Sequence, residues 1–305
     1  MIMTGILLHY FCLMIKENTR TLILLHTAVF LAGWTGIFGR MISLGGLSLV
    51  WVRMIVSVVT LVTVLALTRR LHKVDGKTTR QIMACGILLA LHWVAFFASI
   101  QTANVSIGVA CIATSCFFTS LFEPLFGRKR FSWSEVLISF ISIAGVLLIF
   151  SLDVRYRLGI ALGLLSAALY SIFALCKINV ANRSGEDSAT MLLWELAGGA
   201  LFLTFCLPVQ ARILPSEAIV PAPGDWLWLI LLGSVFTVVP FFFQLQALRK
   251  LSAFTVNLTY NLEPVYSIAL AALLFHETRE VGWSFWLGLT LIVLSVVLQT
   301  RRVKQ

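Results

Sequence analysis

Ten apolar stretches, separated by short polar or glycine-containing connections, run along the chain. A helix needs about 20 apolar residues to cross a bilayer, and most of the stretches come close to that length. Because a backbone in lipid must satisfy its hydrogen bonds within the segment, we expect the stretches to be helices. The pattern therefore predicts an all-α integral membrane protein with ten transmembrane helices. The expected spans are residues 22–42, 46–67, 81–101, 105–126, 133–151, 158–178, 189–208, 226–247, 253–275 and 284–299.

The ten spans divide into two sets of five, within residues 21–151 and 158–299. A unit with an odd number of crossings inserts its second copy upside down. We therefore expect two inverted five-helix repeats around a central cavity, an arrangement common in secondary transporters. Residues 1–20 form an N-terminal extension and residues 300–305 a cytoplasmic tail. The halves share topology and hydropathy, and their sequence identity is weak.

Composition agrees with a membrane location. Of the 305 residues, 59% are hydrophobic and 12% are charged, whereas soluble domains carry about 25% charged residues. The first fifteen residues, MIMTGILLHYFCLMI, are too short to span and lack the basic segment of a signal peptide. Met14 offers a more ordinary start, so we interpret residues 1–13 as the product of an upstream start codon or as an interfacial piece.

The net charge of +10 is distributed asymmetrically. If the N-terminus is cytoplasmic, most lysine and arginine residues fall on the cytoplasmic side, and Lys177 is counted among them. Arg53 is the basic residue placed inside a span. The residues on the opposite side are Arg40, Arg155, Arg157, Arg212 and Arg279. This distribution follows the positive-inside rule and predicts a multi-pass protein of the inner or plasma membrane with both termini cytoplasmic. The basic excess then faces anionic lipid and not nucleic acid.

The sequence does not favour an enzyme. His276-Glu277 begins an H-E-x-x-H motif, but residue 280 is glutamate, so the second zinc ligand is missing. The six cysteines lie in apolar runs without a C-x-x-C pair, and we interpret them as small buried hydrophobic residues. We expect no cofactor, metal site or disulfide. Two alternatives to a transporter remain, a passive facilitator or channel and, more remotely, an intramembrane enzyme.

Four segments carry a resemblance to a known family. They are HTAVFLAGWTGIFGR, VWVRMIVS, FFASIQTANVSIGVACIATSCFFTSLFEP and FFFQLQALRKLSAFTVNLTYNLEPVYSIALAALLFHE. The last is the most specific, with a short basic-Ser turn, a proline in the following span and a terminal L-L-F-x-E. Over residues 20–300 the chain resembles the EamA family of the drug/metabolite transporter superfamily. The first half departs from the pattern, because Arg130 stands where the second half has Glu277.

The resemblance implies export or exchange of amino acids and small metabolites. It also implies two inverted five-helix repeats around a central cavity, with the fifth and tenth helices at the periphery. We therefore expect alternating-access transport of a small polar metabolite such as an amino acid, with export as the expected direction. The partners are the lipid bilayer and a small-molecule substrate, and the protein is expected to be a monomer or a weak homodimer through its peripheral helices.

Polar and aromatic side chains inside the spans are the candidates for substrate binding, because such groups are costly in lipid unless they serve a cavity or a helix contact. The fourth and ninth spans each have a polar face, and aromatic residues such as Trp93, Phe96 and Phe241 fall at similar depths. Pro264 cannot donate a backbone hydrogen bond, so it leaves the carbonyl oxygen of Tyr260, four residues earlier, available to a substrate or ion. The candidates are Trp34, Arg53, His92, Thr119, Tyr170, Gln244, Asn257 and Tyr260.

Three carboxylates within spans are candidates for coupling or for ion pairs. Glu123 lies near the inner end of the fourth span, where an interfacial carboxylate beside Arg128 is the alternative. Glu195 lies toward the inner side of the seventh span. Glu263 is central and could be neutral, paired with Arg53 or a proton carrier. Arg53 itself could bind a substrate carboxylate or form a structural or gating pair with Glu263.

Overall fold

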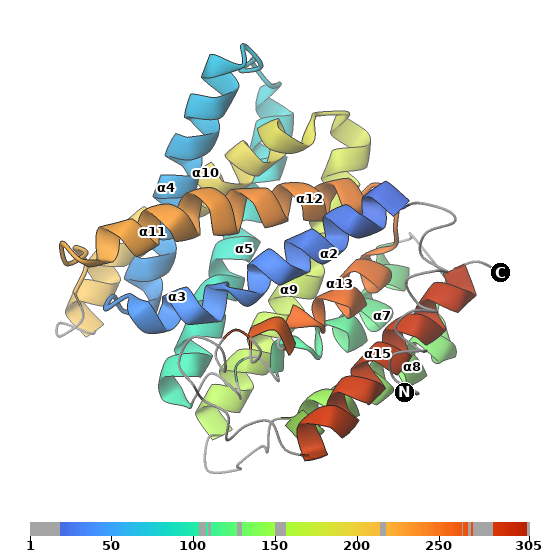
Figure 1. The fold of residues 1–305 in the computed structure, drawn as a ribbon. Coiled ribbons are helices and arrows are strands. Elements are labelled where there is room, and N and C mark those ends of the chain that lie inside the picture. The colour runs from blue at the N-terminus through green and yellow to red at the C-terminus, as the bar shows by residue number, and fades with distance from the viewer. Residues whose placement is uncertain are drawn as a thin grey trace.

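The computed structural model describes residues 19–103, 108, 111–126, 130–149, 157–213, 218–263, 265–267, 270 and 283–303. These residues form a bundle of helices (Figure 1). The N-terminal extension and the His276-Glu277 pair lie outside the described residues. The helices are α2 (Thr19–Gly33), α3 (Thr35–Met41), α4 (Gly46–Leu67), α5 (Gly76–Thr102), α7 (Ser115–Leu125), α8 (Trp133–Ile149), α9 (Arg157–Ser184), α10 (Ser188–Ile213), α11 (Asp225–Gly233), η2 (Ser234–Val238), α12 (Val239–Leu248), α13 (Ala253–Tyr260) and α15 (Trp283–Val303).

Within the described part of the chain, five helical segments are long and apolar enough to cross a bilayer. They are α4, α5, α9, α10 and the continuous segment from α11 to α12. Shorter apolar helices cover Arg20–Gly33, Trp133–Leu148 and Trp286–Gln299. The chain is therefore an all-helical, multi-pass membrane protein.

Several predicted boundaries are wrong, because helices continue past the apolar runs into water. α5 begins at Gly76 and not at residue 81, since the Asp75 carboxylate accepts hydrogen bonds from the backbone N–H groups of Lys77 and Thr78. The connection between α4 and α5 therefore covers residues 68–75. α9 continues to Ser184 and α10 to Ile213.

The first predicted span is broken into α2 and α3 at Trp34. The break leaves the carbonyl oxygen of Gly33 without its helical partner, and the hydroxyl of Ser267 donates a hydrogen bond to it at 2.8 Å. Gly33 also allows the approach, because a Cβ there would lie 2.9 Å from the Cβ of Tyr266. Irregular backbone is tolerated inside a membrane protein where other groups satisfy it in this way.

The ninth predicted span is interrupted as well. α13 ends at Tyr260, four residues before Pro264, as expected for a proline that cannot donate the next hydrogen bond. Tighter bonds then turn the chain, from the N–H of Asn261 to Leu258 O and from the N–H of Leu262 to Thr259 O. Pro264 itself lies outside the described residues.

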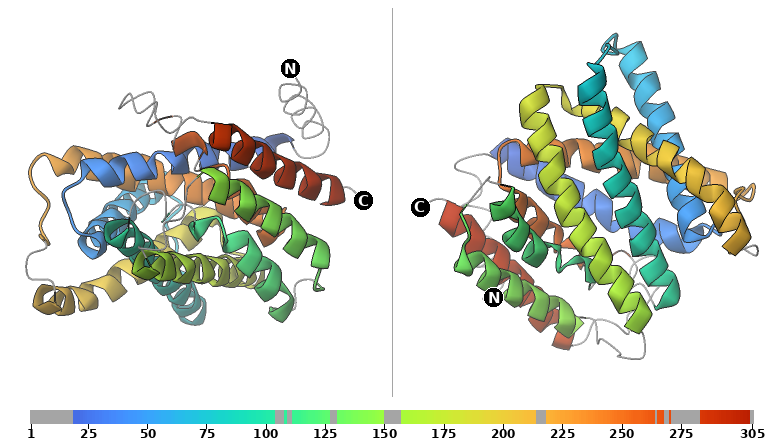
Figure 2. Two further views of the ribbon diagram at one scale, coloured as in Figure 1. Left: turned by 90° about the horizontal axis from the view of Figure 1, so that it is seen from below. Right: turned by 180° about the vertical axis from the view of Figure 1, so that it is seen from behind.

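The helices pack in pairs (Figures 1 and 2). α5 contacts both α9 and α10, and α10 also packs on α4. α12 lies against α2. α8 and α15 pack on each other at one edge of the bundle and contact α7 and α13 on their inner side. These two helices are the predicted fifth and tenth spans, so their position agrees with the expected peripheral location.

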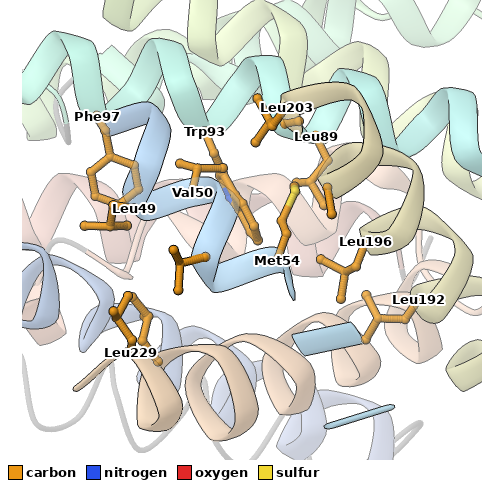
Figure 3. Packing of buried hydrophobic residues seen from close by; sticks show 14 of the residues in the cluster. Leu49, Val50, Met54, Leu89, Trp93, Phe97, Leu192, Leu196, Leu203 and Leu229 are labelled. Atoms are coloured by element: carbon orange, nitrogen blue, oxygen red, sulfur yellow. The ribbon is translucent and has the colours of Figure 1, made fainter. Parts of the chain in front are cut away.

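Buried apolar side chains of α4, α5, α10 and α11 form the largest core cluster, which includes Met54, Leu89 and Leu196 (Figure 3). Glycines let the helix backbones touch. A Cβ on Gly86 would lie 1.8 Å from the carbonyl oxygen of Glu195, and a Cβ on Gly198 would lie 2.5 Å from the Cα of Met83. Lipid tails are as apolar as leucine, so this close packing is a main source of association between α5 and α10.

We call the end of the bundle where α4, α9 and α12 finish and α5, α10 and α13 begin the basic end. Three connections meet there at Glu186. His72 Nε2 lies 2.8 Å from Glu186 Oε2, and Arg249 donates a hydrogen bond to the carbonyl oxygen of Glu186. His72 Nδ1 lies 3.0 Å from the carbonyl oxygen of Arg70. Since both ring nitrogens face acceptors, the doubly protonated imidazolium fits this site.

The hydrogen bond to Glu186, with a smaller contribution from Arg70 O, raises the pKa of His72 above 6.5. A raised pKa stabilises the fold below pH 6.5, and this contribution is lost as pH rises through the folded-state value. We expect NMR of ¹³C-histidine-labelled protein to show His72 titrating above pH 6.5. Glu186→Gln should move that titration down, and His72→Asn identifies the signal. Titration of His72 at or below pH 6.5 in the wild type would contradict the contact.

Candidate functional site

A cavity of about 70 Å³ lies between helices from both halves of the chain. Its wall combines one arginine, one carboxylate, one histidine and several aromatic side chains. The lining residues are Ala32, Thr35, Arg53, His92, Trp93, Phe96, Ile112, Ala113, Ser115, Tyr170, Phe241, Tyr260, Asn261 and Glu263. Five of the predicted candidates, Arg53, His92, Tyr170, Tyr260 and Glu263, are therefore brought together.

Arg53 is held by groups on two neighbouring helices. Its Nε donates a hydrogen bond to Thr237 Oγ1 at 2.7 Å, and its guanidinium carbon lies 4.0 Å from the ring centroid of Trp93. A cation over an indole face is attracted by the ring quadrupole. No hydrogen bond to the two Nη nitrogens is present within the described residues, although the side chain is only 2% exposed. The fork of the guanidinium is thus available to an acceptor in the cavity.

A turn of π-helix presents Thr237 to Arg53. In η2 the hydroxyl of Thr237 donates to the carbonyl oxygen of Leu232, five residues back, at 2.6 Å. The hydroxyl of Ser57 on α4 donates to the carbonyl oxygen of Gly233 at 2.7 Å. π-turns inside helices occur frequently at functional sites. This one fastens the segment α11–α12 to α4 beside the cavity.

Glu263 lines the same cavity as Arg53, and their charges attract each other. The two side chains form no ion pair within 4 Å in the described structure. The pairing that the sequence offered as one alternative is therefore not made in this conformation. Both residues line the cavity without an ion pair between them.

His92 is oriented by α9. Its Nδ1 lies 3.0 Å from the carbonyl oxygen of Ser166 and 2.8 Å from the Ser166 hydroxyl. Ser166 Oγ in turn donates to the carbonyl oxygen of His92 at 3.0 Å. Because the carbonyl can only accept, we assign the hydrogen of the neutral imidazole to Nδ1, which leaves Nε2 as an acceptor. The imidazole also lies 4.9 Å from the Tyr170 ring, measured between centroids.

Several buried polar atoms near the cavity lack a hydrogen-bond partner among the described residues. They include the hydroxyl of Tyr260, Gln244 Oε1 and Asn257 Oδ1. Gln244 Nε2 donates to the hydroxyl of Tyr170. Buried polar groups are normally satisfied, so the hydroxyl of Tyr260, a residue that lines the cavity, is suited to water or a ligand.

Other candidates serve helix contacts beside the cavity and do not belong to its described lining. The side-chain amide of Asn257 donates to Thr119 Oγ1 at 2.8 Å and joins α13 to α7. Trp34 packs on Phe236 with ring centroids 5.6 Å apart. Gln244 reaches the site only through Tyr170. Glu123 is buried near the end of α7, and Arg128 lies outside the described residues.

The prediction that Lys177 lies on the cytoplasmic side of the membrane is wrong. Lys177 is fully buried in α9, and its Nζ lies 2.9 Å from Glu195 Oε2 on α10. Glu195 therefore forms an ion pair, one of the two roles expected for it, and its partner is Lys177. One signal could have revealed the pair. Lys177 precedes Ser184 by seven residues and Glu195 follows Ser188 by seven, so the opposite charges lie at the same depth on consecutive helices.

Thr35 lines the cavity, and Ser166 and Thr237 hold residues that line it, although the sequence did not place these three among the candidates. Thr35 follows the break in the first span, Ser166 is a small residue on α9, and Thr237 depends on the π-turn. Each role depends on irregular backbone or on a neighbouring helix. The spacing of polar residues along one helix predicts neither.

A helical membrane protein with a largely apolar cavity that contains a few charged and polar groups, lined by residues of both halves, has an architecture suited to a small-molecule transporter. The model of the EamA-like transporter family matches residues 19–151 and again residues 157–301. The chain belongs to this family. A transporter of this kind acts in a lipid bilayer on a small-molecule substrate.

Two further comparisons agree with this assignment. The chain is 23% identical over 263 residues to the "Uncharacterized transporter YxxF" of Bacillus subtilis (strain 168), which covers 84% of this chain and 82% of that protein. A solved structure described only as "Crystal structure of protein" superposes with a TM-score of 0.76 at 15% identity. That match covers 95% of this chain and all of the other, and it shows a shared fold.

Proposed function

We propose that the protein is a secondary transporter that exports a small polar solute with a carboxylate group, such as an amino acid, by alternating access. The observation that carries the proposal is Arg53, a buried cation at the cavity with its Nη nitrogens free of hydrogen bonds in the described structure. Guanidinium binds carboxylate through two parallel hydrogen bonds. A buried cation without such a partner is costly, so a substrate carboxylate stabilises it.

Glu263 extends this match to amino acids. A zwitterionic amino acid carries an ammonium group close to its carboxylate. The cavity lining contains both Arg53 and Glu263, without an ion pair between them, so each is available to the opposite charge of the amino acid. His92 and Tyr260 add a hydrogen-bond acceptor and an orphan hydroxyl. Trp93, Tyr170 and Phe241 supply the apolar surface for a side chain.

The size of the cavity favours a closed state of the transport cycle. Its volume is about 70 Å³, roughly half that of the 150 Å³ cavity that holds benzene in an engineered protein. An amino acid with a side chain requires the site to widen. In alternating access, substrate binding shifts the population between conformations that open the site to opposite sides.

The helix contacts support an inverted repeat. α5 packs on α9 as α12 packs on α2, and α10 packs on α5 as α11 packs on α4. α7 contacts α8 and α9 as α13 contacts α15 and α2. The pairs α4–α10, α7–α13 and α8–α15 join equivalent helices of the two halves. Exchanging the halves thus reproduces the contact pattern, as expected for ten spans related by a two-fold axis in the membrane plane.

The positive-inside rule supports a cytoplasmic location for the basic end. Arg69, Arg70, Lys73, Arg183 and Lys250 lie at or near it. Both termini then face the cytoplasm of a cell whose inner or plasma membrane holds the protein.

Counterflow in proteoliposomes tests the proposal. Vesicles preloaded with an unlabelled amino-acid mixture should take up radiolabelled amino acids in a transient, saturable overshoot, and competition by single amino acids identifies the substrate. Liposomes without protein are the control. Flux that rises linearly with concentration and shows no exchange would indicate a passive channel and would contradict the proposal.

A further inference from the structure

Lys177 and Glu195 form an ion pair in the interior of the bundle, between α9 and α10. Lys177 Nζ lies 2.9 Å from Glu195 Oε2, and both side chains are completely buried. The central cavity does not include either residue. The pair is therefore a second charged site, separate from the proposed substrate site.

The surroundings give this pair little support. Apart from the contact between them, Lys177 Nζ and both carboxylate oxygens of Glu195 have no hydrogen-bond partner in the described structure. Buried ion pairs recover the cost of desolvation only when further hydrogen bonds satisfy both groups. Within the described residues the Glu195 carboxylate has the Lys177 ammonium as its polar partner, whereas that ammonium also lies near the rings of Phe173 and Phe241.

Aromatic rings separate the pair from the central cavity. Lys177 Nζ lies 5.2 Å from the ring centroid of Phe173 and 5.4 Å from that of Phe241, and Phe241 lines the cavity. Lys177 follows Tyr170 by two helical turns, roughly 10 Å along α9. The pair therefore lies just beyond the cavity on the side of the basic end.

A cleft of about 260 Å³ approaches the pair from the basic end. Cys85 and Cys176 line it, and Arg183 stands toward its outer part. Cys176 directly precedes Lys177, and Cys85 interacts electrostatically with both Glu195 and Lys177. The cleft therefore reaches residues that are neighbours of the pair.

The helices around the pair carry several titratable groups within the bundle. Cys85 and His92 lie on α5, and Tyr170 and Cys176 lie on α9. Arg53 lies on α4, Glu123 on α7 and Tyr260 on α13, which pack on α9 or α10. α12 contributes Phe241. Lys177 is the charge that acts on the Glu195 carboxylate.

We propose that Glu195 is a proton-binding site that exchanges its proton with the cleft at the basic end, with Lys177 as its counter-charge. The inference rests on the proposed function, because it assigns the coupling ion of that transporter. Hydronium transfers a proton to Glu195 Oε2 and becomes water as the contact with Lys177 Nζ breaks, and the proton returns to a water molecule when the contact reforms. The neighbouring ammonium repels metal cations, so the ligand is the proton.

Infrared difference spectra of the purified, detergent-solubilised protein test the site without any transport assay. Acidification should produce a carbonyl stretching band of a protonated carboxylic acid that is lost in Glu195→Gln. Glu186→Gln, which removes a carboxylate at the surface, should retain the band. A spectrum of Glu195→Gln identical to that of the wild type would overturn the proposal.

Proteoliposomes test the coupling. Glu195→Gln should retain counterflow of radiolabelled amino acids, and its uptake driven by a pH gradient should fall to the level of empty liposomes. Equal loss of both activities, with full recovery of both in the neutral double variant Lys177→Met/Glu195→Gln, would show a structural role and overturn the proposal. Absence of counterflow in the wild type would refute the proposed function, and the infrared result would still decide the proton site.

Discussion

Arg53→Gln should raise the KM for amino-acid counterflow about 10- to 100-fold. A charge-assisted hydrogen bond contributes about 1.5–3 kcal/mol, and each 1.4 kcal/mol corresponds to a tenfold change in affinity. Glutamine keeps a polar group at the cavity but removes the cation and its fork. The hydrogen bond from Nε to Thr237 is lost as well, so part of the effect comes from a less ordered wall.

Two further variants define the role of Arg53. Arg53→Lys retains a cation without the fork, and an intermediate KM is expected. Arg80→Gln removes an exposed arginine of α5 and should leave KM unchanged. A fall in maximal rate at unchanged KM for Arg53→Gln would assign the residue to gating and would contradict substrate binding.

Lys177→Met should lower the melting temperature on the order of 10 °C. The substitution leaves the Glu195 carboxylate fully buried without a counter-charge, and breaking a buried pair in this way costs about 3–5 kcal/mol. Thermal unfolding in detergent, followed by tryptophan fluorescence, measures the loss. Lys73→Met, at an exposed position, is the matched control and should have little effect.

The double variant Lys177→Met/Glu195→Gln should recover most of that stability. Neutral side chains of similar volume often replace a buried ion pair without loss. The two single effects are then strongly non-additive, as expected for residues in direct contact. Additive losses, or a single variant as stable as the wild type, would show that the 2.9 Å contact contributes little.

The apolar runs of the sequence predict where helices lie, because lipid admits few other structures. The prediction of 46–67 coincides with α4, and that of 133–151 begins at the same residue as α8. The ends of α5, α9 and α10 were predicted poorly. Their terminal turns are polar, and capping groups such as Asp75 determine where they start.

Lys177 shows why hydropathy misplaces some charges. A lysine near the end of a span usually extends its chain to the interface, and this explanation fits the sequence equally well. In the structure α9 packs on α5, and the Lys177 side chain lies inside the bundle against Glu195. Glu195 lies on another helix, and the spacing of polar residues along α9 does not predict which residue of that helix faces Lys177.

For the polar faces of the spans, the sequence leaves a cavity and a helix contact open as alternatives. Thr119 and Asn257 each lie on a polar face, and the structure joins them to each other. A helical wheel gives the direction of a face within one helix and not its rotation relative to a neighbour. Arg53, His92 and Tyr170 reach the cavity because three separate helices are rotated toward a common point.

The π-turn of η2 determines the direction, about the helix axis, in which the side chains of α12 point. Its extra residue shifts α12 by about 100° relative to an uninterrupted α-helix, because each residue advances the helix by that angle. Phe241 and Gln244 owe their orientation toward Arg53 and Tyr170 to this shift. Deletion of one residue from Ser234–Val238 would therefore rotate both side chains away from the cavity together.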